Sequence, residues 1–286
     1  MSLALENVTF TYMPKTPFEK TAINDVSLTV ESGEFTAIIG HTGSGKTTLL
    51  QHFNGLLQPD KNKGSVYVDG EKITKKNLRD VRMKVGYVFQ YPEHQLFEET
   101  VFKDIAFGLK RLKLSDEETR ERVLAAAKTV ELDEALLERS VFELSGGEKR
   151  RVAICGVIVT NPKYLLLDEP ASGLDPQGKR EIMKLLKSLN ERGITIVFIS
   201  HSMDDVAENA RRVVIVNDGR IGLDGTPYEV FKNRELLTTW GLDVPEVTIL
   251  FDNFARESGM DIPHVIKVSE GVELVRKLKA EGRLAQ

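Results

Sequence analysis

The sequence predicts an α/β fold: a parallel sheet with an antiparallel β region before it, a helical insertion within it and a short helical extension after it. Three observations support this prediction. The apolar run Phe35–Ile39 leads through a glycine-rich loop into a helical pattern at Lys46–Phe53. Apolar runs of strand length then alternate with helical patterns, and such alternation builds parallel sheets. The segment from about 91 to 160, by contrast, is mainly helical.

Short apolar or partly alternating runs predict the strands. Two such runs open the chain, and another, followed by an Asp-Gly turn, comes after the first helix. The remaining runs are continuous and apolar, as expected of strands buried on both faces of a parallel sheet. The predicted strands are residues 3–12, 22–30, 35–39, 64–68, 85–89, 164–167, 194–199 and 212–217.

Apolar periodicity and N-terminal caps predict the helices. Ser115 and Glu118 form a capping box, which opens a helix with apolar residues on one face. Ser145 is expected to cap a helix from residue 148 to residue 160. Helices are also predicted at 176–192 and 203–209, between the later strands.

The chain is expected to divide near Val244 and Pro245, into a main region 1–243 and an extension 244–286. Val247, Leu250, Phe251 and Phe254 form a helical stripe in the extension, and a last helix is predicted at 269–280. Two short amphipathic helices cannot bury both apolar faces alone. We therefore expect them to pack on the main domain or on another subunit.

Composition limits the possible functions. The chain has 286 residues, of which 41% are hydrophobic, enough for a substantial core in one large domain or two modest ones. A net charge of −4 gives no general attraction to nucleic acid, so no nucleic-acid partner is expected. The single cysteine, Cys155, lies in an apolar run and is expected to be a buried small hydrophobe.

The N-terminal segment lacks the basic start and apolar core of a signal peptide. No apolar stretch approaches the ~18 residues needed to span a bilayer. We therefore expect a soluble, cytosolic chain that reaches a membrane only through partners.

The glycine-rich loop carries the strongest chemical signal. Residues 40–47, Gly-His-Thr-Gly-Ser-Gly-Lys-Thr, fit the P-loop pattern in its strand–loop–helix context, where backbone N–H groups cradle phosphates. Lys46 is expected to neutralise the β- and γ-phosphates, Thr47 to ligate Mg²⁺, and Thr48 to bond the α-phosphate. An incidental glycine turn is the weak alternative. The predicted nucleotide-binding residues here are Gly40, His41, Thr42, Gly43, Ser44, Gly45, Lys46, Thr47 and Thr48.

Two carboxylates end the apolar strand at 164–167. This segment resembles a Walker B motif, in which Asp168 would hold Mg²⁺ and Glu169 would polarise the attacking water as general base. Adjacent acids at the carboxyl end of a buried strand lie where α/β sheets bind ligands. A solvated strand end is the alternative.

Three more polar residues follow strands or turns. Gln90 could reach Mg²⁺ or the lytic water, although a lone glutamine is more often a surface residue. His201 could hydrogen-bond the γ-phosphate, although a lone histidine is more often structural or exposed. Residues 172–175, Ser-Gly-Leu-Asp, could form an ordinary turn in which Asp175 caps the next helix.

Residues 144–148, Leu-Ser-Gly-Gly-Glu, place backbone N–H groups at a helix N-terminus, which is a natural anion site. The two glycines allow close approach, but the motif alone is a weak signal. The basic residues 149–151 are interpreted either as a solvated face or as positive potential near phosphate.

Taken in order, these segments resemble the ABC ATPase family over about residues 3–231. The resemblance implies that Tyr12 stacks on adenine. It also implies that Ser145, Gly146 and Gly147 bind the ATP held by an opposite subunit, and that Asp175 couples the two sites. The two phosphate-binding segments would then serve different nucleotides, and a working ATPase would need two chains.

The resemblance is closer still to the ATPase subunits of energy-coupling factor (ECF) transporters, through residues 40–57, 89–97 and 99–108. That family implies an ATPase with ATP and Mg²⁺, peripheral on the cytoplasmic face of the cell membrane. Two such subunits would pair as a homodimer or a related heterodimer. The segment after Gln90 would form part of a groove that grips the coupling helices of a transmembrane coupling subunit. That subunit would connect to a substrate-binding membrane subunit that takes up a vitamin or transition-metal ion. The C-terminal helices resemble a dimer-contacting extension.

Residues 144–148 resemble the signature motif of ABC ATPases, which usually ends in Gln, whereas this chain has Glu148. The added negative charge near phosphate would cost affinity unless Lys149 or Arg150 offsets it, and we expect it to be tolerated. Two other functions are considered. A binding-only ABC subunit fits poorly with Glu169 and His201. A non-transport ABC protein fits poorly with one cassette and a short insertion.

Overall fold

The computed structural model describes residues 1–284 and contains two sheets. The antiparallel sheet has the strand order β2-β1-β4-β5, and the larger sheet has the order β10-β9-β3-β8-β7-β6. Strands β9, β3, β8, β7 and β6 are parallel, and β10 is antiparallel to β9. These arrangements confirm the predicted α/β core with an antiparallel N-terminal region. The strands are β1 Ser2–Tyr12, β2 Lys20–Glu31, β3 Phe35–Ile39, β4 Ser65–Val68, β5 Glu71–Lys72, β6 Val85–Val88, β7 Tyr164–Asp168, β8 Thr195–Ile199, β9 Arg212–Asn217 and β10 Arg220–Gly225.

The central strands β3, β7 and β8 are buried along their whole length, which explains their continuous apolar runs. On one face of the large sheet, α1 packs between it and the antiparallel sheet through Leu49, Leu50 and Phe53. On the other face, α6 and α7 complete a second core. The P-loop helix is therefore fixed between two sheets.

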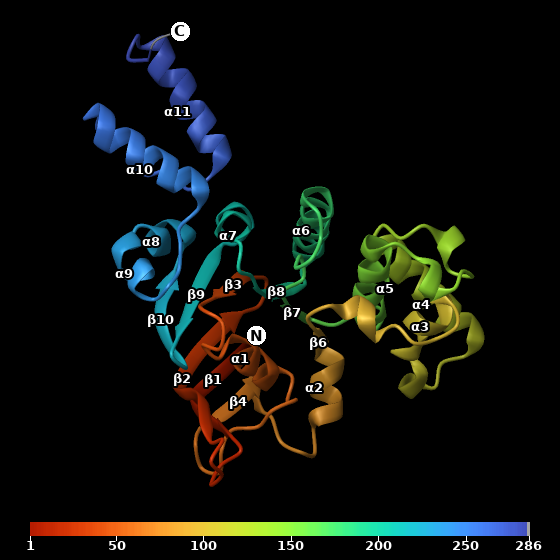
Figure 1. Cartoon of the computed structure of the whole chain (residues 1–286). Helices are drawn as coiled ribbons and strands as arrows, with labels where there is room; N and C mark the ends of the chain where they lie inside the picture. Colours follow the sequence, from red (N-terminus) through yellow and green to blue (C-terminus); the bar gives the residue numbers. More distant parts are fainter. Residues whose placement is uncertain (285–286) are drawn as a thin grey trace.

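The helices fall into three groups in Figure 1: those against the sheets, a group of α3, α4 and α5 beside them, and a C-terminal pair that extends away from them. The middle group lies between β6 and β7 in sequence. The helices are α1 Lys46–Phe53, α2 Leu78–Lys84, α3 Val101–Phe107, α4 Asp116–Thr129, α5 Gly146–Ile158, α6 Pro176–Glu191, α7 Met203–Asn209, α8 Pro227–Phe231, α9 Arg234–Thr239, α10 Glu246–Ser258 and α11 Val268–Ala280.

The predicted caps are present. Ser115 caps α4 in a capping box with Glu118, and Asp175 caps α6 through the Gly178 amide. Helix α5 begins at Gly146 rather than at residue 148, because the Ser145 side chain accepts from the Glu148 amide and places both glycines in the first turn.

Short elements escaped the sequence prediction. Helix α2 buries a single side chain, Val81, so it offers no apolar period to detect. Strand β10 follows β9 through Asp218 and Gly219, both at positive φ, and this Asp-Gly turn is the signal that would have predicted the hairpin. Helix α9 likewise buries a single side chain, Leu237. Helix α8 opens with a capping box of Thr226 and Glu229, which is a sequence signal that the prediction missed.

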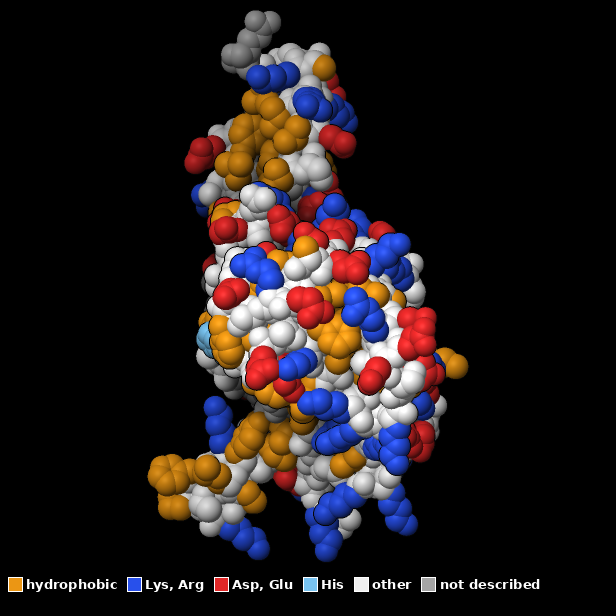
Figure 2. Space-filling view, turned by 90° about the vertical axis from the view of Figure 1, so that its right-hand side faces the viewer, with side chains coloured by type: hydrophobic (Ala, Val, Ile, Leu, Met, Phe, Trp, Pro, Cys, Tyr) orange, Lys and Arg blue, Asp and Glu red, His pale blue; other side chains and the backbone are white. Residues whose placement is uncertain are grey.

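Helices α10 and α11 pack on each other around Val247, Phe251 and Leu274. Ile249 of α10 and Ile266, in the segment between the two helices, pack on the core of the main domain, and polar contacts also join α10 to it. Figure 2 shows apolar side chains gathered on this projection, where Leu250, Val268 and Val272 are exposed. In residues 1–284, no helix has the length and hydropathy to cross a bilayer.

Candidate active site

The phosphate loop connects the end of β3 to the start of α1. Gly40, Gly43 and Gly45 all have positive φ, a region that L side chains avoid. A Cβ atom at Gly45 would also collide with the Ala22 carbonyl oxygen, so both backbone conformation and space require glycine there. The loop thus brings backbone amides to the N-terminus of α1, which favours an anion.

Lys46 is buried at the centre of this loop. Its Nζ donates to the carbonyl oxygens of Gly40 at 2.8 Å and His41 at 3.0 Å. Burial lowers the pKa of Lys46, and the nearby Glu169 and Asp168 partly oppose this effect. A desolvated ammonium group without a direct carboxylate partner is well suited to meet a phosphate.

Asp168 and Thr47 meet at the end of β7. The Thr47 hydroxyl donates to Asp168 Oδ2 at 2.8 Å, and the Tyr87 hydroxyl lies 3.4 Å from the same oxygen. Burial raises the pKa of Asp168, and the Thr47 hydrogen bond opposes this shift. The hydroxyl, the carboxylate and the Gln90 amide oxygen are hard donors that suit Mg²⁺.

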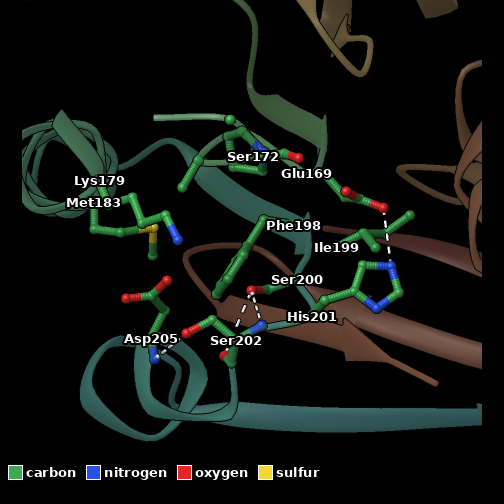
Figure 3. A pocket seen from close by; sticks show the side chains of 13 residues that line it. Glu169, Ser172, Lys179, Met183, Phe198, Ile199, Ser200, His201, Ser202 and Asp205 are labelled. Atoms are coloured by element: carbon green, nitrogen blue, oxygen red, sulfur yellow. Dashed lines mark hydrogen bonds and ion pairs between the residues drawn. The ribbon is translucent and has the colours of Figure 1, made fainter. Parts of the chain in front are cut away.

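Glu169 is held by two polar side chains. Gln90 Nε2 donates to one carboxylate oxygen at 2.9 Å, and His201 Nε2 lies 2.9 Å from the other. Glu169 also has a positive φ of 52°, an uncommon conformation for a residue other than glycine. Figure 3 shows the His201 ring directed at Glu169, beside a cavity of about 270 Å³ that continues toward α6 and α7. The carboxylate is therefore fixed in orientation.

A cavity of about 630 Å³ is lined by Lys46, Thr47 and Glu169 together with other residues of the site. It lies between the phosphate loop, the start of β2 and the loops after β6, β7 and β8. Ten of the lining residues are predicted site residues: Tyr12, Thr42, Gly43, Gly45, Lys46, Thr47, Thr48, Gln90, Glu169 and His201. The other two, Lys20 and Ala22, escaped the sequence prediction. No sequence pattern marks them, because it is the pairing of β1 with β2 in the folded chain that sets Lys20 opposite Tyr12.

The signature segment and Asp175 do not line this cavity. Ser145 forms a capping box with Glu148: the Glu148 carboxylate accepts from the Ser145 amide at 2.8 Å and from its hydroxyl at 2.6 Å. These hydrogen bonds lower the pKa of Glu148. A single chain therefore brings the P-loop residues together with Gln90, Glu169 and His201 in one cavity. Gly146 and Gly147 lie outside this cavity.

The position of Arg150 contradicts two interpretations of the sequence: that it belongs to a solvated face, and that it offsets the charge of Glu148. It is 1% exposed, so it forms no part of a solvated face. Its guanidinium binds both carboxylate oxygens of Glu93 and the carbonyls of Pro170 and Ser172. It therefore does not offset the charge of Glu148, which the cap at Ser145 engages instead. Cys155 is buried as expected, and burial raises its pKa to about 12.

Comparisons with known proteins agree with this geometry. A family model described as "ABC transporter" matches residues 23–172. The energy-coupling factor transporter ATP-binding proteins EcfA2 of Acetivibrio thermocellus and Clostridium perfringens are 47% and 50% identical, each over 97% of this chain and 98% of the relative. The solved cbiO1 of Clostridium perfringens, part of the ABC transporter complex cbiONQ, is 37% identical with a TM-score of 0.75, over 90% of this chain and 98% of that one. A dimeric ATP-binding cassette with ADP and Pi is 32% identical with a TM-score of 0.70, over 79% of this chain and 98% of that one.

The fold and the site together define an ABC-type ATPase. Within that class, the chain belongs to the family of energy-coupling factor transporter ATP-binding proteins, of the EcfA2 kind. It is thus an ATP-binding subunit whose ATPase activity is coupled to uptake through membrane components.

Proposed function

We propose that the chain hydrolyses ATP with Mg²⁺ at a site completed by a second ABC ATPase subunit, and thereby drives import of a vitamin or transition-metal ion. The observation that carries the proposal is the Glu169 carboxylate, held by Gln90 and His201 at the end of β7 beside the phosphate loop. Among the described residues that line the cavity, Glu169 is the one carboxylate.

Each residue has a proposed role. The loop amides and Lys46 bind the β- and γ-phosphates, and Tyr12 supports the adenine. Thr47, Asp168 and Gln90 hold Mg²⁺, which would neutralise phosphate charge in the transition state. Glu169 accepts a proton from water as the water oxygen attacks the γ-phosphorus, and the bond to the β–γ bridging oxygen breaks. His201 contacts the γ-phosphate as well as Glu169.

The second subunit supplies the missing half-site. Ser145, Gly146, Gly147 and Asp175 lie outside the cavity of their own chain, which supports a role at the ATP of a partner. Dimeric solved cassettes of similar fold are consistent with this arrangement. The partner is a second copy or a related ATPase. The exposed apolar side chains of the extension 244–286 support a second dimer contact outside the ATP-binding domain 1–243.

Membrane partners are proposed to bind beside Gln90, placing the chain on the cytoplasmic face of the cell membrane. Tyr91 and Phe97 follow Gln90 and are exposed, and Phe97 packs edge-on against the exposed Phe107 of α3. This apolar surface fits a helix of a transmembrane coupling subunit, which in turn contacts a substrate-binding membrane subunit.

Purification of the tagged chain from membranes of its own host tests the transport function. We expect a second ATPase subunit or copy, a transmembrane coupling protein and a small substrate-binding membrane protein to co-purify. Mass spectrometry of the complex would identify each of them. Recovery of the chain without any membrane protein would contradict the proposal.

The Glu169→Gln variant tests hydrolysis. Loss of the base should abolish ATPase turnover, while ATP-driven dimerisation persists, because the phosphate loop and Lys46 are unchanged. Phosphate release and size-exclusion chromatography with ATP measure the two properties. The control, Glu191→Gln, removes an exposed carboxylate at the end of α6 and should retain full turnover. Undiminished turnover in Glu169→Gln would exclude Glu169 as the base.

A further inference from the structure

Lys20 lies in the nucleotide cavity, although no sequence motif includes it. It is the first residue of β2 and pairs with Tyr12 across the β1–β2 ladder. Residues directly opposite each other in an antiparallel pair project from the same face of the sheet. The Lys20 ammonium and the Tyr12 ring are therefore set side by side above the phosphate loop.

The position of the Lys20 ammonium is defined by Gly43. A methyl group built on Gly43 would lie 3.6 Å from Lys20 Nζ, so the ammonium stands over the middle of the phosphate loop. Among the described residues that line this cavity, Glu169 is the one carboxylate, and Gln90 and His201 already hold both of its oxygens. The lining of the cavity thus leaves the positive charge of Lys20 without a protein anion.

Lys46 and Lys20 approach the loop from different sides. Lys46 comes from α1 and is tied to the carbonyls of Gly40 and His41. Lys20 comes from β2, next to Tyr12, whose hydroxyl lies 3.1 Å from the Thr48 hydroxyl. A nucleotide with its base at Tyr12 and its phosphates on the loop amides must pass its α- and β-phosphates beneath Lys20.

We propose that Lys20 is a second phosphate-binding cation, which contacts the diphosphate part of the bound nucleotide and therefore acts on ATP and ADP alike. The inference rests on the proposed nucleotide site and adds a contact to it. Because the Lys20 side chain is exposed, water weakens its attraction to phosphate, and we expect a moderate contribution to affinity.

Nucleotide titration of the full-length chain tests this role. Calorimetry with ADP and with a non-hydrolysable ATP analogue would compare wild type, Lys20→Gln, Lys20→Arg and a control, Lys187→Gln, on the exposed face of α6. We expect Lys20→Gln to weaken the binding of both ligands by a similar factor of about 3 to 5. Lys20→Arg keeps the charge and should stay within about 2-fold of wild type, and Lys187→Gln should be unchanged.

The salt dependence of nucleotide affinity separates the effect of the Lys20 charge from that of the side chain's shape. The affinity of wild type for ADP should fall more steeply with salt concentration than that of Lys20→Gln, because one charge contact is lost. Unchanged ADP affinity in Lys20→Gln, or equal losses in the Gln and Arg variants, would overturn the role of Lys20. Absence of ADP and ATP binding in wild type would instead contradict the nucleotide site itself.

Discussion

His52 is fully buried on α1, just beyond the residues that line the nucleotide cavity. Its Nδ1 lies 2.7 Å from the Thr48 carbonyl oxygen, so this nitrogen carries a proton and donates it. In the described part of the chain, Nε2 has no partner. The ring edge meets Phe10, which in turn meets Tyr12. His52 thus supports the aromatic residues beside the cavity, and burial lowers its pKa below the ordinary value of 6.5.

Folding stability should therefore depend on the protonation of His52. Above pH 6.5 both the folded and the unfolded chain hold His52 neutral, and its contribution is complete. Below that pH, His52 is protonated in the unfolded chain but stays neutral in the folded chain. The free energy of unfolding therefore decreases as the pH falls, by at most about 1.4 kcal/mol per pH unit. Urea unfolding of wild type and His52→Gln between about pH 5 and 8 measures the slope.

The glutamine at position 52 can still donate to the Thr48 carbonyl but cannot titrate, so the slope should flatten in His52→Gln. His94→Gln, at an exposed histidine, is the control and should keep the wild-type slope. Identical pH slopes in wild type and His52→Gln would show that another group titrates.

Most residues of the cavity could be predicted because each follows a strand or loop of recognisable pattern. Gln90, Glu169 and His201 stand just past the ends of the neighbouring parallel strands β6, β7 and β8, whose carboxyl ends meet at one edge. Lys20 could not be predicted in this way, because the register of β1 on β2 places it there, across the loop 13–19. Such a pairing is a long-range property of the fold.

At the scale of the elements, the Arg150 side chain connects α5 to two of the loops around the ATP site. Arg150 lies within α5, and its guanidinium binds Glu93 in the turn after Gln90 and the carbonyls of Pro170 and Ser172 after β7. The helix that begins with the signature glycines is thereby tied to two segments that flank Glu169. A displacement of the turn after Gln90 would be transmitted to α5 through this contact.

Removal of this contact should destabilise the fold. Arg150→Met leaves Glu93 partly buried without its partner, and loss of one member of a buried ion pair costs about 3–5 kcal/mol. The double variant Glu93→Met with Arg150→Met should recover part of this loss, because no unpaired charge remains. Urea unfolding gives each value. Lys149→Ala, at the preceding position of α5, should change stability by less than about 0.5 kcal/mol. A near-neutral Arg150→Met would contradict the structural role.

Three helix starts were predictable from their caps, although the capping box that opens α8 at Thr226 was missed. Ser115, Ser145 and Asp175 each accept a backbone amide at the start of a helix, and these caps are visible in the sequence. Helix α2 has no side-chain cap and buries one side chain. The interpretation of residues 149–151 as a solvated face is wrong at Arg150 for a related reason, since the burial of Arg150 depends on Glu93, which is distant in sequence.

At the scale of the whole molecule, we propose that the chain carries two half-sites for ATP in two separate places. The phosphate loop, Gln90, Glu169 and His201 share one cavity, while Ser145 and Asp175 lie outside it. The connection between the two halves runs through Arg150 and the loop after β7. Two chains arranged head to tail would bring the signature glycines of each to the loop of the other, and closed symmetric pairing would complete both sites.

A mixing experiment tests this arrangement. Ser145→Arg disrupts the signature motif and leaves the phosphate loop intact. Lys46→Ala disrupts the phosphate loop and leaves the signature motif intact. Each variant alone should lose most of its ATPase activity, and Ser145→Arg should bind ATP as the isolated monomer with wild-type affinity. In a mixed dimer, the intact phosphate loop of the Ser145→Arg chain faces the intact signature motif of the Lys46→Ala chain. One complete ATP site therefore forms in each mixed dimer.

An equal mixture should therefore recover activity, up to about a quarter of wild type if pairing is random, since half of the dimers are mixed and each has one working site of two. If purification identifies a related ATPase as the partner, the Lys46 substitution is made at the equivalent lysine of that subunit instead. Phosphate release from the mixture, compared with the two variants alone, is the measurement. Inactivity of the mixture, with both variants folded and dimerising, would mean that Ser145 acts within its own chain. Loss of monomer ATP binding in Ser145→Arg would lead to the same conclusion.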